Sequence, residues 1–99
     1  DLAGALDAYT QSQTIRAKLA AADPGNAGWQ RDLIVSYVKL AGVAGAGPHP
    51  AAAATYYRQA LDVARTLAAT GRLAPVDAWM VEDLERRLAA AEATPTQPP

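Results

Sequence analysis

Two acid–base pairs near the C-terminus have a spacing that lets their side chains interact. Glu82 and Arg86, like Asp83 and Arg87, stand four residues apart with the acid first, the order that favours ion pairs along one helix face. Catalysis by a carboxylic acid requires a water-poor cleft that raises its pKa, whereas a neighbouring arginine lowers that pKa. The spacing therefore favours a salt-bridged helix surface, with a charge patch for a partner as the alternative.

The other reactive side chains do not form a catalytic set. His49, the only histidine, stands between two prolines in a predicted loop, where a lone imidazole is usually an exposed or capping group. Ser12 and Ser36 do not lie in the strand–turn–helix elbow of a hydrolase nucleophile. The chain has no cysteine for a thiolate, a disulfide or a cysteine-ligated zinc ion. We expect no catalytic residue, no cofactor and no metal, and therefore no enzyme.

Two tryptophans are candidates for recognition. Trp29 and Trp79 each lie near the start of a predicted helix. An indole ring in this position commonly anchors one helix on its neighbour, and its N–H finds a partner at the edge of the core. Tryptophan is also enriched at the energetic centres of protein interfaces. Both roles remain open for these two residues.

Composition limits the classes of partner. The chain has 99 residues, the size of one small domain, and a net charge of −1. This charge does not provide the basic stripe expected of a nucleic-acid-binding surface. The most apolar stretch, residues 33–54, is interrupted by Lys39, Pro48 and Pro50 and cannot cross a membrane. We expect no nucleic-acid or membrane partner, and a cytoplasmic location.

Apolar residues recur with helical periodicity in four segments. The predicted helices cover residues 3–22, 27–44, 50–70 and 75–93. Pro24 and Gly25 favour a turn after the first helix, Pro48 ends the second, and Pro75 suits the first turn of the fourth. The predicted fold class is therefore all-α.

The first and third predicted helices repeat one pattern at an offset of 48 residues. Residues 5–9 read ALDAY, and residues 53–57 read AATYY. Farther along, Leu19 corresponds to Leu67 at the same offset. Repetition of a two-helix unit predicts an α-solenoid of antiparallel helix pairs, about two units long. The expected domains are a repeat domain at residues 1–93 and a disordered, proline-rich tail at residues 94–99.

These positions resemble the tetratricopeptide repeat family. Its second helices carry a ladder of small, aromatic and small residues, and its first helices carry a leucine followed by an aromatic residue. The matching positions here are Ala5, Tyr9 and Ser12; Ala53, Tyr57 and Ala60; and Leu33 and Tyr37. The offset of 48 exceeds the usual unit of about 34 residues, so the chain is closest to the elongated repeats of bacterial and kinesin-light-chain type. Ile34 departs from the family, which has Gly or Ala there.

The resemblance implies a scaffold that binds a protein or peptide on a concave face formed by the second and fourth helices. The predicted partner-binding residues are Arg31, Val35, Val38, Lys39, Glu82 and Arg86. Arg31 and Lys39 suit a peptide carboxylate, but Val35 replaces the asparagine of the family's carboxylate clamp. The alternative is a structural segment that packs against its own array or a second copy, as a homo-oligomer, without a ligand.

Overall fold

The computed structural model describes residues 2–47 and 50–93, and this part of the chain contains helices and turns but no strand. The helices are α1 (Leu2–Ala22), α2 (Ala27–Gly45), α3 (Ala52–Ala69) and α4 (Met80–Glu92), with a short 3₁₀ helix, η1 (Pro75–Asp77), before α4. The all-α prediction with four helices is confirmed. His49 and the predicted tail at residues 94–99 lie outside the described residues.

Local sequence explains where α2 begins and where α3 ends. The side chain of Asn26 accepts a hydrogen bond from the backbone N–H of Trp29 at 3.1 Å, which caps α2. After α3, Gly71 adopts a φ of 69°, and the backbone N–H of Arg72 donates to the Leu67 carbonyl at 2.8 Å. This is the Schellman arrangement, in which glycine takes the left-handed position that other residues avoid.

The fourth helix begins later than predicted. The predicted range starts at Pro75, but Pro75–Asp77 form the tight turn η1, and α4 begins at Met80. The backbone N–H of Ala78 donates to the Pro75 carbonyl at 3.2 Å, which is an i→i+3 bond. The side chain of Asp77 is paired with Arg31 of α2. Because this tertiary ion pair holds the turn, the start of α4 depended on more than the local sequence.

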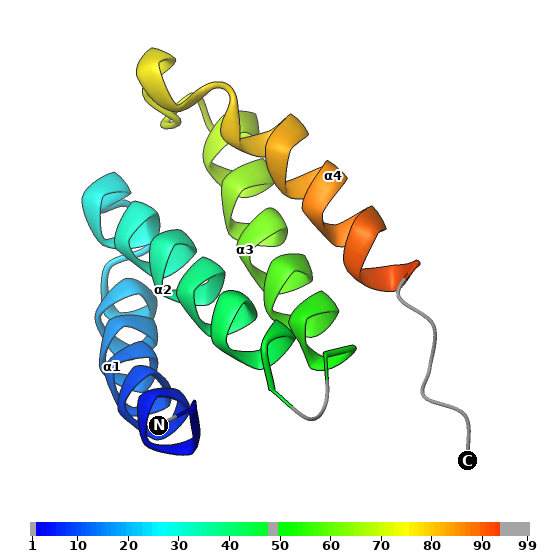
Figure 1. Ribbon diagram of the computed structural model, residues 1–99. Coiled ribbons are helices and arrows are strands. Elements are labelled where there is room, and N and C mark those ends of the chain that lie inside the picture. Colours follow the sequence, from blue (N-terminus) through cyan, green and yellow to red (C-terminus); the bar gives the residue numbers. More distant parts are fainter. Residues whose placement is uncertain (1, 48–49, 94–99) are drawn as a thin grey trace.

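Consecutive helices run in opposite directions and lie side by side (Figure 1). The large interfaces join α1 to α2, α2 to α3, and α3 to α4, and no other pair of described helices shares an interface of comparable extent. Pairing of sequence neighbours is the arrangement expected of stacked helical repeats. Consequently, α3 has a helix on each side, whereas α1 has a large interface with α2 alone.

The hydrophobic core is built around α3. Ala60 and Ala64 are completely buried there, and their small side chains let the neighbouring helices approach closely. The other buried members of this cluster are Ile34, Leu61, Leu67, Met80 and Leu84. They come from α2, α3 and α4, so these three helices share one core cluster. This packing also positions α2 and α4 relative to each other.

Candidate functional site

Helices α2 and α4 enclose a hollow of about 270 Å³, here called the α2–α4 hollow. Its lining residues are Ile34, Val35, Val38, Lys39, Trp79, Met80, Asp83, Leu84 and Arg87. Ile34, Met80 and Leu84 are buried core residues, so they form a floor that packing already holds in place. Trp79 stands at the rim with 57% of its surface exposed. The result is an apolar depression with an exposed indole and three charged side chains.

The structure brings together half of the predicted partner-binding residues. Val35, Val38 and Lys39 of α2 line the hollow. On α4, Glu82 and Arg86 are exposed but do not line it, whereas the next residues, Asp83 and Arg87, do. One residue turns the direction of a side chain by about 100° around a helix. The α4 residues that line the hollow are therefore offset by one position from those predicted to bind a partner. The partner-binding role of the predicted side chains remains a prediction.

Arg31 does not line this hollow, because it is bound elsewhere. Its Nε donates to Asp77 Oδ2 at 2.7 Å, and its Nη2 donates to Asp77 Oδ1 at 3.2 Å. Asp77 is only 5% exposed, so this two-point contact compensates a buried carboxylate. The hydrogen bond from Arg31 lowers the pKa of Asp77 and raises the pKa of Arg31. Arg31 ties α2 to η1 instead of presenting a free cation to a partner.

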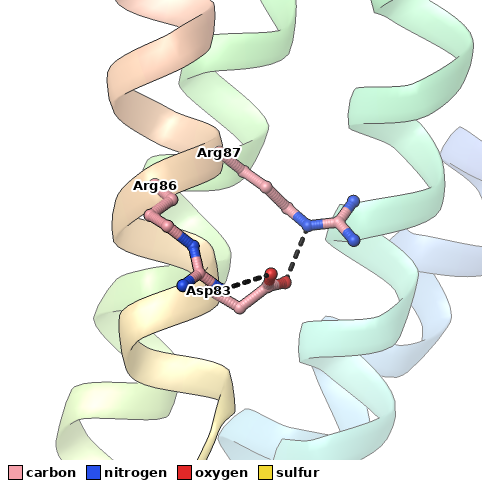
Figure 2. Close-up of polar contacts among 3 residues, drawn as sticks. All are labelled: Asp83, Arg86 and Arg87. Atoms are coloured by element: carbon pink, nitrogen blue, oxygen red, sulfur yellow. Dashed lines mark hydrogen bonds and ion pairs between the residues drawn. The ribbon is translucent and has the colours of Figure 1, made fainter.

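Asp83 organises the two arginines of α4 (Figure 2). Arg87 Nε donates to Asp83 Oδ2 at 2.7 Å, and Arg86 Nη2 donates to Asp83 Oδ1 at 3.2 Å. The hydrogen bond from Arg87 is the main cause of the lowered pKa of Asp83, with Arg86 adding to it. Asp83 is therefore held as a carboxylate and is unsuited to donate a proton near neutral pH.

Arg87 also extends from α4 toward α2 (Figure 2). Its pKa is raised, first by Asp83 and further by the hydroxyl of Tyr57 on α3. Arg87 lines a second hollow as well, at the N-terminal end of α3, together with Pro50 and Tyr57. Arg87 thus borders two hollows. The sequence identified the Asp83–Arg87 pair from its spacing, whereas Arg86, which was expected to pair with Glu82, pairs with Asp83. The place of Asp83 and Arg87 beside a hollow depends on the packing of α4.

The two tryptophans have different surroundings. Trp29 is half-buried in the first turn of α2, whereas Trp79 is largely exposed and lines the α2–α4 hollow. Trp79 directly precedes α4, after the turn η1. The sequence marked both as possible anchors or interface residues. The exposure of Trp79 matches the second role more closely than the first.

The described residues contain no group of three or more His, Asp or Glu side chains that could hold a metal ion. In the same part of the chain, no helix combines the length and apolar character needed to span a bilayer. Comparisons of the chain with protein-family models, with curated proteins and with solved structures found no match.

Proposed function

We propose that the domain is a non-enzymatic interaction module that binds a segment of a protein partner in the α2–α4 hollow. The observation that carries this proposal is the exposed Trp79 beside an apolar floor that is already packed. Tryptophan is among the residues that dominate interface energies, especially beside a pocket that excludes water. The partner segment would insert an apolar side chain between Trp79 and Val38.

The charged residues at the rim would orient this segment. Lys39 extends from α2, while Asp83 and Arg87 lie on α4. An apolar centre surrounded by polar groups is the usual organisation of a protein interface. Because Asp83 is already bonded to Arg86 and Arg87, Lys39 is the cation of this rim that is placed to pair with an acidic group of the partner.

The preformed floor favours recognition of a short segment. Ile34 and Leu84 belong to the hydrophobic core, so binding would not require them to become ordered. Ordering of interface side chains opposes association by about 0.5–1.5 kcal/mol for each flexible side chain. This interpretation agrees with the resemblance to tetratricopeptide repeats, in which the helices matching α2 and α4 form the binding face.

Selection of peptides from a random library tests the proposal. Peptides enriched on the wild-type domain would be measured against Trp79→Ala and Val35→Lys, with Val76→Ala as the control. Val76 is exposed and close to Trp79 in sequence, but it does not line the hollow. We expect each change in the hollow to weaken binding about tenfold or more, since hot-spot truncations cost roughly 2 kcal/mol or more.

Binding should also shift the fluorescence emission of Trp79 to shorter wavelengths as its indole leaves water. Replacing Trp29, the other tryptophan of the chain, by Phe isolates the fluorescence of Trp79. Circular dichroism checks that every variant stays helical. The proposal fails if no peptide is enriched, or if enriched peptides bind Trp79→Ala and Val35→Lys as tightly as the wild type.

The outer face of α1 favours a second candidate function, self-association or packing within an array. Ile15 is 62% exposed and Leu19 is 42% exposed. Their repeat counterparts on α3, Val63 and Leu67, are packed against the core. Sedimentation equilibrium distinguishes this candidate: a dimer that dissociates in Ile15→Lys supports it, and a wild-type monomer of 10.3 kDa at every concentration excludes a homo-oligomer.

A further inference from the structure

We infer that a separate hollow, between α1 and α2, binds a phosphate-type oxyanion. This α1–α2 hollow has a volume of about 320 Å³. Its lining residues are Ala8, Tyr9, Ser12 and Arg16 of α1, and Ser36 and Lys39 of α2. They comprise two cations and three hydroxyl groups, and no acidic residue is among the described residues that line the hollow. The site goes beyond the proposed peptide-binding role of the α2–α4 hollow.

No described carboxylate forms an ion pair with the cations that line this hollow. Among the described residues, neither Arg16 nor Lys39 forms an ion pair. The arginines that do so are Arg31, Arg58, Arg65, Arg86 and Arg87. Arg16 and Lys39 lie on different helices and line the same hollow. An anion between them would gain two charge-assisted hydrogen bonds from opposite walls.

The hydroxyl groups favour a tetrahedral anion over a planar carboxylate. Arg16 Nη1 donates to Ser12 Oγ at 2.6 Å, which holds the guanidinium in place. Of the other two hydroxyl-bearing residues that line the hollow, Ser36 is only 3% exposed and Tyr9 is 39% exposed. Serine and tyrosine hydroxyls can donate hydrogen bonds to an acceptor. Donors from several directions match the three or four acceptor oxygens of a phosphate group better than the two of a carboxylate.

The internal repeat has different residue types at the positions of Ser12 and Arg16. At the offset of 48 residues, Ser12 and Arg16 of α1 correspond to Ala60 and Ala64 of α3. Both alanines are completely buried in the core. Where α3 has two small apolar residues that seal its interface, α1 has a hydroxyl and a guanidinium beside a hollow. The departure from the repeat therefore coincides with the cluster of anion-binding groups.

Titration with inorganic phosphate tests the site. Backbone and side-chain resonances of the full chain would be followed by NMR at constant ionic strength. We expect saturable shifts at Ser12, Arg16, Ser36 and Lys39, and weaker binding by about tenfold in Arg16→Gln, because a hydrogen bond to a charged group contributes this much. Lys39→Gln should weaken phosphate binding as well, and its replacement does not disturb the core because this side chain is exposed. Lys39 also lines the α2–α4 hollow, so only Arg16→Gln tests the phosphate site apart from the peptide site.

Lys18→Gln is the matched control. It removes one positive charge from α1, but Lys18 is exposed and does not line the hollow. The inference is overturned if the shifts do not saturate, if Lys18→Gln weakens binding as much as Arg16→Gln, or if acetate binds as tightly as phosphate. Thermal unfolding monitored by circular dichroism verifies that each variant is folded under the titration conditions.

A second titration separates a free phosphate ion from a phosphate group carried by a protein. Its probes are a five-residue alanine peptide with a central phosphoserine and the same peptide with serine. Tighter binding of the phosphopeptide than of inorganic phosphate identifies a phosphorylated protein as the source. Binding of inorganic phosphate without the phosphopeptide identifies the free ion. Arg16 does not line the α2–α4 hollow, so Arg16→Gln should leave the selected peptides bound there.

Discussion

Helices α1 and α3 carry the same sequence pattern but have different surroundings. Leu67 of α3 is 3% exposed, whereas its counterpart Leu19 of α1 is 42% exposed. The reason is position: α3 lies between α2 and α4, while α1 has a large interface with α2 alone (Figure 1). An apolar residue contributes to stability through the area that its neighbours cover. The comparison shows that repeated sequence does not produce repeated burial.

The largest expected contrast is between Leu67→Ala and Leu19→Ala. Leu67→Ala should lower the free energy of unfolding by about 2–5 kcal/mol, the range for a buried leucine that leaves a cavity. Leu19→Ala should cost less than about 1 kcal/mol, because much of this side chain is already in water. Urea denaturation of the two variants measures both effects. Equal losses would show that another chain covers the outer face of α1 in solution.

The ends of α1 and α3 provide the next contrast. Gly71→Ala forces a side chain into the left-handed conformation after α3, with φ at 69°, and should cost about 1 kcal/mol or more. Gly25→Ala, after α1, should change the free energy of unfolding very little. The new Cβ would lie 3.3 Å from the end of the Arg72 side chain, which is flexible and can move away. Thermal unfolding of both variants checks this order. A similar loss in Gly25→Ala would contradict it.

The α4 side of the molecule should also be the more sensitive to acid. Asp77 and Asp83 both have a lowered pKa in the folded protein, through Arg31 and Arg87 respectively. Each therefore contributes stability that is present above the unfolded pKa of about 3.9 and is lost as the pH falls through the folded value. We expect the free energy of unfolding to decrease below about pH 4.

Asp77→Asn and Asp83→Asn should each weaken this acid dependence, and Asp7→Asn on α1 serves as the control. Asp7 is exposed and bonded to Gln11 within its own helix. Denaturation at a series of pH values measures the slopes. An unchanged slope in both Asp77→Asn and Asp83→Asn would show that other carboxylates govern the acid transition.

The smallest effect is expected at the surface of the α3–α4 interface. Arg65 Nη2 lies 3.6 Å from Glu85 Oε2, and both side chains are about half exposed. Arg65→Ala should lower the free energy of unfolding by less than about 1 kcal/mol, as is usual for an exposed pair. Lys18→Ala on α1 is the matched change without an ion pair. Thermal unfolding at low and high salt measures the difference, which should disappear at high salt.

Much of the α2 side of the hollow could be predicted from the sequence. The resemblance to tetratricopeptide repeats implied a binding face with Arg31, Val35, Val38 and Lys39 of α2, and the last three line the hollow. The resemblance also implied Glu82 and Arg86 of α4, but Asp83 and Arg87 line the hollow in their place. The turn η1 moves the start of α4 from Pro75 to Met80, and the side of α4 that faces α2 depends on how the two helices pack.

The roles of Arg31 and Arg16 could not be predicted for a different reason. Arg31 is bound by Asp77, which lies 46 residues away in sequence. No local pattern identifies such a partner, because the pair depends on how α2 and η1 meet. Arg16 differs from Arg31 because it has no carboxylate partner among the described residues. Its position in the repeat matches the buried Ala64 of α3, and only the packing of α1 on α2 shows that Arg16 borders a hollow with Lys39.

The sequence by itself determined that the chain forms four helices and where most of them end. Helical periodicity, proline and glycine act over a few residues, so these features follow from local chemistry. The tertiary structure alone decided which helix is covered on both sides and which side of α4 faces the hollow. It also decided which of the described arginines and lysines have no carboxylate partner in an ion pair. These properties arise from contacts between distant segments, and a repeated pattern does not specify how many neighbours each of its copies will have.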